Sequence, residues 1–152
     1  MAHRTTLAAT FLFVALLLPM SAQAAKWQQL AGYGSSYIDV ESVRGDEFPK
    51  MSPTGITQFV NGQLPIERVT VAWLWLIDEG VSSRIEVAFD CQGSMAVIQQ
   101  LIIHQTPKSP YQSFDNTASF RQGGLQKRSV PPDTTYEAAE KIACKLKPPR
   151  AK

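Results

Sequence analysis

Few side chains in this sequence have the type and spacing that catalysis requires. His3 and His104 are the only histidines, and His3 lies in a segment that we expect to be removed, so a site built from several histidines is excluded. His104 falls in a predicted strand, where we interpret it as a hydrogen-bonded histidine of the sheet; the alternative is a lone general base. No Gly-x-Ser-x-Gly turn presents a serine, and Gly32-x-Gly34 lacks the third glycine of a phosphate-binding loop. We therefore expect no catalytic residue, no metal ion and no cofactor.

Two pairs of carboxylates share strand faces in the predicted structure. Asp39 and Glu41 form one pair, and Glu86 and Asp90 form the other. Such pairs can act as acid and base when burial separates their pKa values. In the strand predicted at Ser83–Cys91 apolar and polar residues alternate, and Glu86 and Asp90 fall on its polar face. We therefore expect both side chains to be solvated rather than catalytic.

The first 24 residues are typical of a secretory signal. His3 and Arg4 precede an apolar run from Leu7 to Leu18, and Ala22-Gln23-Ala24 supplies the small residues that a signal peptidase recognises. The run is shorter than the about 20 apolar residues of a membrane anchor. We expect cleavage after Ala24 and an exported chain without an integral membrane segment. No cysteine lies beside the cleavage point, so a lipid anchor is not expected.

Cys91 and Cys144 are the only cysteines of the chain. In an exported protein two cysteines most simply pair, which predicts a structural disulfide. A redox pair would have the spacing Cys-x-x-Cys, and a zinc site would need further ligands.

We expect residues 25–147 to form one domain, followed by a basic tail at 148–152. Of the 15 basic and 13 acidic residues, Arg4 is the only one within the signal, so the remaining chain is nearly neutral. This balance argues against a nucleic-acid partner. The tail is interpreted as a solubilising terminus, with contact to an acidic surface as the alternative.

Three strands are predicted by alternating and continuous apolar patterns, at Glu67–Asp78, Ser83–Cys91 and Met95–Thr106. Short turns join them, so they form an antiparallel meander. The first strand is apolar on both sides, which predicts a central strand that is covered on both faces. We therefore expect Trp73 and Trp75 to be core residues rather than a platform for a sugar or a base.

The segments before and after this meander carry weaker signals. Residues 26–41 predict short strand pieces, and residues 42–66 look irregular. Within the latter, Ile56–Leu64 predicts a small hairpin, because Asn61-Gly62 suits a type I′ turn. Residues 107–133 look looped, with one short strand between Gln126 and Val130.

A helix is predicted from Thr134 to the Pro148-Pro149 pair. Thr134 and Glu137 fit a capping box, in which each side chain accepts from a free backbone N–H group. Cys144 would attach this helix to the strand that ends at Cys91. The predicted fold class is α+β, an antiparallel meander with a C-terminal helix packed on it and held by one disulfide.

The sequence from 26 to 145 resembles the surface-adhesin protein E-like domain family, small exported proteins of Gram-negative bacteria. The matching landmarks are spread along the chain: Trp27, Tyr37-x-Asp39 with Ser42, Ala72-Trp73 leading to Asp78, Phe89-Asp90-Cys91, and the helix from Pro132 to Cys144. The resemblance implies an antiparallel sheet packed on a C-terminal helix. It also implies adhesion to host matrix proteins, as in the member that gave the family its name.

Three function classes follow. The first is a non-enzymatic protein-binding domain, which acts in the cell envelope or adheres to host matrix proteins. The second is a periplasmic inhibitor or a carrier of a small ligand, and the third is an enzyme, which the missing motifs disfavour. Localisation is expected in the periplasm or at the cell surface, and a homodimer is a further option.

We place the predicted partner-binding surface on loops, because recognition usually lies on loops that a rigid sheet carries. The segment Ser52–Ile66 would expose a small apolar tip around the Asn-Gly turn, and a basic region would supply cations for an acidic protein partner. The alternative is that the apolar side chains of the tip fold back onto the sheet. The predicted contact residues are Phe59, Asn61, Leu64, Arg121, Lys127 and Arg128.

Overall fold

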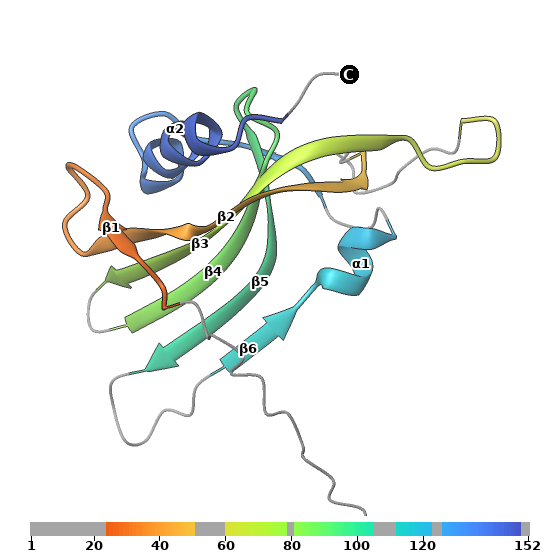
Figure 1. Cartoon of the computed structure of the whole chain (residues 1–152). Coiled ribbons are helices and arrows are strands. Elements are labelled where there is room, and N and C mark those ends of the chain that lie inside the picture. Colours follow the sequence, from red (N-terminus) through yellow and green to blue (C-terminus); the bar gives the residue numbers. More distant parts are fainter. Residues whose placement is uncertain (1–23, 51–59, 79–80, 105–111, 123–125, 150–152) are drawn as a thin grey trace, which may run out of the picture.

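The computed structural model describes residues 24–50, 60–78, 81–104, 112–122 and 126–149. Within these ranges the chain is dominated by β-strands, with two α-helices (Figure 1). The elements in chain order are β1 (Trp27–Gln29), β2 (Ser36–Pro49), β3 (Ile66–Asp78), β4 (Val81–Phe89), β5 (Ser94–His104), β6 (Gln112–Asp115), α1 (Thr117–Arg121), β7 (Arg128–Ser129) and α2 (Thr135–Leu146).

The sheet is an antiparallel meander in which β1 to β6 are neighbours in chain order. The predicted meander of three long strands is confirmed as β3, β4 and β5. The short β7 also pairs with β5, at the start of that strand, whereas β6 pairs with its later part. The predicted short strand between Gln126 and Val130 is therefore confirmed.

The prediction that residues 42–66 are irregular is wrong for the part up to Pro49. The strand β2 continues that far because it pairs with β3 from Arg44 opposite Val71 to Pro49 opposite Ile66. A bulge interrupts the pairing between Asp39 and Arg44. The bulge breaks the alternation of apolar and polar residues along β2, and a proline ends the strand. A pattern of period two therefore does not reveal this part of the strand.

Ser42 and Asp39 hold the bulge. The Ser42 hydroxyl donates to the carbonyl of Asp39 at 2.7 Å and accepts from the backbone N–H of Trp73 at 3.0 Å. The Asp39 carboxylate accepts from the backbone N–H groups of Lys26 and Glu41. The landmarks Asp39 and Ser42 thus satisfy backbone groups at the bulge, and Asp39 also satisfies the N–H of Lys26 before β1.

Two apolar cores lie on opposite faces of the sheet. The first lies between the sheet and α2 (Figure 1) and includes Leu30, Ile38, Val43, Ala72, Leu74, Ile85, Val87, Phe89, Met95, Ala139 and Ala143. The second lies on the other face and consists of Phe48, Val69, Val71, Ala88, Ala96 and Ile98. The central strand β3 is therefore covered on both faces at Val69–Ala72, as predicted.

The short helix α1 covers the second core. It contacts both β2 and β5, and because β3 and β4 separate these strands, the sheet curves around it (Figure 1). The guanidinium of Arg121, in α1, lies 5.0 Å from the ring centre of Phe48. Both α1 and β6 fall in the segment 107–133 that we predicted to be looped. The four residues of β6 are all exposed, so the segment lacks the burial pattern of a core strand.

The predicted C-terminal helix is confirmed as α2, with Thr134 as its N-cap. The Thr134 hydroxyl accepts from the backbone N–H of Glu137. The reciprocal half of the capping box differs from the prediction, because the Glu137 carboxylate accepts from the N–H of Asp133, one residue before the N-cap.

A tight turn at Asn61-Gly62 is also confirmed. Both residues have positive φ, 51° and 76°, and Val60 pairs with Gln63 across the turn. The first part of the predicted hairpin, including Phe59, lies outside the described residues.

Candidate binding surfaces

The residues predicted to contact a partner lie at several places in the fold. Asn61 is exposed in the turn before β3, and Leu64 is partly buried beside it. Arg121, from α1, lies over Phe48 and within 3.8 Å of the Asp46 carboxylate. Arg128 is exposed on β7 and, within the described chain, has no ion pair or ring contact.

Lys127 is held by internal ion pairs. Its ammonium contacts the carboxylate of Asp90 and lies 4.0 Å from that of Glu67, and only 20 % of its side chain is exposed. Asp90 is enclosed in the same cluster, with 8 % of its side chain exposed. The expectation that Asp90 is solvated is wrong, because the chain after β6 covers the turn that carries it.

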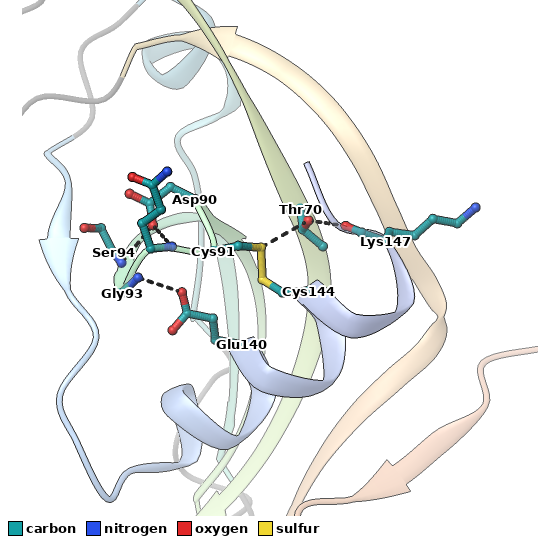
Figure 2. The surroundings of a disulfide bond; sticks show 9 residues. Thr70, Asp90, Cys91, Gly93, Ser94, Glu140, Cys144 and Lys147 are labelled. Carbon is teal, nitrogen blue, oxygen red and sulfur yellow. Dashed lines mark hydrogen bonds between the residues drawn. A yellow bond between two sulfur atoms is a disulfide. The ribbon is translucent and has the colours of Figure 1, made fainter. Parts of the chain in front are cut away.

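The turn from Asp90 to Ser94 attaches α2 to the sheet (Figure 2). Cys91 and Cys144, which lie 53 residues apart in sequence, form the predicted disulfide. Beside it the Glu140 carboxylate, on α2, accepts from the backbone N–H of Gly93 at 3.0 Å. The landmark Phe89-Asp90-Cys91 therefore has a structural role in holding the helix.

Two carboxyl groups at this turn, Asp90 within it and Glu140 on α2, have pKa values that are shifted in opposite directions. Burial acts to raise the pKa of Asp90, but hydrogen bonds from Lys127 and from the backbone N–H groups of Gln92 and Ser94 outweigh it and lower that pKa. Burial raises the pKa of Glu140 above its usual value, and the Gly93 N–H offsets this only in part. Asp90 thus stabilises the turn itself, and Glu140 connects the turn to α2.

Glu86 is also buried, which contradicts the predicted polar face of β4. Only 4 % of the residue is exposed. Its carboxylate accepts from the Arg44 guanidinium, on β2, and from the Gln99 amide, on β5, each at 2.6 Å. The curvature of the sheet brings these three strands together, and we call the three residues the Arg44–Glu86–Gln99 bridge.

The sheet face that carries the second core also presents aromatic side chains, in the part that α1 does not cover. Tyr37, Trp75 and Arg84 lie directly opposite one another on β2, β3 and β4, so they share a face. Trp27 joins them from β1, with its ring centre 5.7 Å from that of Trp75. We call these four residues the aromatic patch.

Arg84 is the exposed member of the patch. Its guanidinium lies 5.8 Å from the ring centre of Trp27 and 5.6 Å from that of Trp75. Within the described chain no carboxylate pairs with it. The two indoles hold the cation in place by cation–π contact and leave its N–H groups available to an anion.

The structure differs from the prediction that Trp73 and Trp75 are core residues. Both are only partly buried, whereas Val69 and Val71 on the same strand face are fully buried in the second core, which lies beside α1. Sequence reasoning also missed Arg84. The register of the β3–β4 hairpin could have indicated this residue, because it places Arg84 opposite Trp75.

A cavity of about 550 Å³ opens beside the predicted residue Arg128. It lies between β5, β6, β7 and the start of α2, and its walls combine apolar side chains with amides. The lining includes Met95, Val97, Gln100, Phe114, Arg128 and Tyr136. Burial raises the pKa of Tyr136, so its hydroxyl is a neutral hydrogen-bonding group there.

Within the described ranges no three His, Cys, Asp or Glu side chains come together in a way that could hold a metal ion. No helix in those same ranges is both long enough and apolar enough to cross a membrane. Comparison with family models, with curated proteins and with solved structures gave no match.

Proposed function

We propose that this protein is an exported, non-enzymatic binding domain that uses the aromatic patch to contact another protein, in the cell envelope or in a host matrix. The observation that carries the proposal is the position of Arg84 against Trp27 and Trp75. Arginine and tryptophan supply much of the binding energy at protein interfaces, because they combine a large apolar surface with fixed hydrogen-bond donors.

The patch is also suited to recognition because it is preorganised. Trp75 donates to the Ser82 hydroxyl at 2.7 Å, and its ring packs against Tyr37 with centres 5.5 Å apart. A side chain that is already fixed loses little conformational entropy on binding. The partner expected here has a carboxylate for Arg84 and an apolar or aromatic group for the indoles.

The proposal is tested by capture from envelope and host-matrix extracts, followed by affinity measurement with the purified partner. Arg84→Glu is expected to weaken binding by about tenfold or more, since it replaces attraction by repulsion at the centre of the contact. Arg128→Glu is the matched control, because it makes the same charge change on the surface that the sequence predicted. If Arg128→Glu weakened binding and Arg84→Glu did not, the interface would lie on the predicted loops and the aromatic patch would be rejected.

A carrier of a small ligand is a second candidate, favoured by the cavity beside Tyr136 and Arg128. Its volume is in the range of drug-sized ligand sites, and Arg128 would select an anionic group. Native mass spectrometry of the exported protein tests this candidate. A bound small molecule that Arg128→Glu removes would support it, and a protein that stays free of ligand in the presence of envelope extract would reject it.

A further inference from the structure

On the other side of β1, this edge strand faces α2 across a groove. A groove of about 730 Å³ separates the two elements, and residues of both line it: Lys26, Trp27, Gln28, Val40, Lys141, Ile142, Lys145 and Leu146. We propose that this β1–α2 groove binds an extended acidic peptide segment of a partner protein, which adds to the sheet as an antiparallel strand beside β1.

Within the described chain, the outer edge of β1 is free to pair with another strand. Lys26 and Leu30 direct their backbone groups at β2, since the Lys26 carbonyl accepts from Val40 and the Leu30 N–H donates to Ser36. Alternate residues of a strand point to opposite edges, so the N–H and C=O groups of Trp27 and Gln29 face outward. Within the described chain the sheet ends at β1, so these groups are available to another strand.

The groove combines an apolar floor with positively charged side chains. Val40, Ile142 and the half-exposed Leu146 supply an apolar floor, and Lys26, Lys141 and Lys145 supply charge around it. Glu137 neutralises Lys141 at 2.7 Å, whereas Lys26 and Lys145 have no ion pair within the described chain. Two unneutralised ammonium groups on either side of an apolar floor favour a segment with carboxylates around an apolar side chain.

The free edge of β1 and the charges of the groove together determine the residue pattern expected of the bound strand. Residues opposite Trp27 and Gln29 would hydrogen-bond to β1, and the residues between them would direct their side chains toward α2. A segment with the pattern Glu-x-Val-x-Glu places both carboxylates and the apolar side chain on the α2 side. This is peptide recognition by strand addition, in which backbone bonds supply affinity and alternate side chains supply specificity.

The test uses a fluorescent peptide, Ser-Glu-Ser-Val-Ser-Glu-Ser, with the full chain purified after export. Binding is expected by fluorescence anisotropy, and the peptide with lysine in place of both glutamates is expected not to bind. The double variant Lys26→Glu with Lys145→Glu should weaken binding by about tenfold at low ionic strength, and less as salt rises. Lys50→Glu, a charge reversal of an exposed lysine just after the far end of β2, should leave the affinity unchanged.

N-methylation of the peptide separates strand addition from simple charge attraction. Methyl groups on the two central serines remove the N–H donors that face β1, and binding should be lost. Methyl groups on valine and the second glutamate face away from β1 and should be tolerated. Equal affinity of both methylated peptides, or equal affinity of the acidic and basic peptides, would overturn the inference.

The amide spectrum of the protein shows which site is used. Shifts of the Trp27 and Gln29 amides together with those of α2 are expected. Shifts confined to Arg84 and Trp75 would overturn the groove while leaving the aromatic patch as the interface. Loss of the protein partner with Arg84→Glu but unchanged peptide binding would show that the two sites act independently.

Discussion

The carboxylate of Glu86 lies 2.6 Å from the guanidinium of Arg44, although β3 separates the strands that carry them. The second oxygen of Glu86 accepts from Gln99 on the far side. This bridge lies at the border between the core that α1 covers and the open aromatic patch. It links three strands on the face where the sheet curves, and this explains why an acidic residue is buried in β4.

Removal of Arg44 is expected to destabilise the protein more than neutralisation of Glu86. Arg44→Met leaves a buried carboxylate with only Gln99 as a partner, which should cost about 2–3 kcal/mol, less than for a fully buried pair because 46 % of the Arg44 side chain is exposed. Glu86→Gln keeps an acceptor for Arg44 and should cost about 1 kcal/mol. Urea unfolding of both variants and of the double variant measures the difference, and equal costs would contradict the role of the bridge.

Ser42→Ala is expected to lower the free energy of unfolding by about 1–2 kcal/mol, because it removes the acceptor of the Trp73 N–H and the donor to the Asp39 carbonyl. The bulge of β2 then has no side chain to satisfy these backbone groups. Ser113→Ala is the matched control on the exposed strand β6 and should change stability by less than about 0.5 kcal/mol. Similar effects of the two changes would show that Ser42 does not hold the bulge.

The parts of the fold that were predictable have strong local signals. The strands β3, β4 and β5, the turn at Asn61-Gly62 and the helix capped by Thr134 all follow from periodicity and turn chemistry. The later half of β2 was missed, because the bulge at residues 40–43 breaks its alternation. Neither β6 nor α1 was predicted, because exposed short elements lack an apolar pattern.

The proposed binding surfaces could not be predicted because they depend on which parts of the sheet are covered. Trp73 and Trp75 have the same sequence pattern as Val69 and Val71, but tertiary packing leaves the tryptophans partly buried and places the valines in the second core. Lys127 likewise carries the charge expected of a surface residue, and its ion pair with Asp90 is set by tertiary structure.

The disulfide is expected to contribute about 2–5 kcal/mol to stability, because it closes a loop of 53 residues. The double variant Cys91→Ser with Cys144→Ser should show this loss in urea unfolding without a free thiol that could form other bonds. In the unmodified protein the intact mass should rise by two hydrogens on reduction. Two thiols that react with a labelling reagent in the unreduced protein would contradict the pairing.

The turn that contains Asp90 is expected to lose stability in acid. The hydrogen bonds from Lys127 and from two backbone N–H groups lower the pKa of Asp90 in the folded protein below its ordinary value of 3.8. The stabilisation is therefore complete above that value and is lost as the pH falls through the lower folded pKa. Glu140 has the opposite sign, because burial raises its pKa above 4.5, so ionisation of this group opposes folding at neutral pH.

Asp90→Asn should lower the free energy of unfolding at pH 7, because Lys127 loses its main partner while the amide oxygen still accepts from Gln92 and Ser94. The difference from the unmodified protein should shrink as the pH falls below 3.8, where protonation removes the same charge from Asp90. Glu140→Gln should be neutral or stabilising at pH 7 and should have no such benefit well below pH 4.5. Urea titrations at several pH values measure both differences. A destabilisation by Asp90→Asn that stays constant or grows in acid would show that its charge does not stabilise the turn.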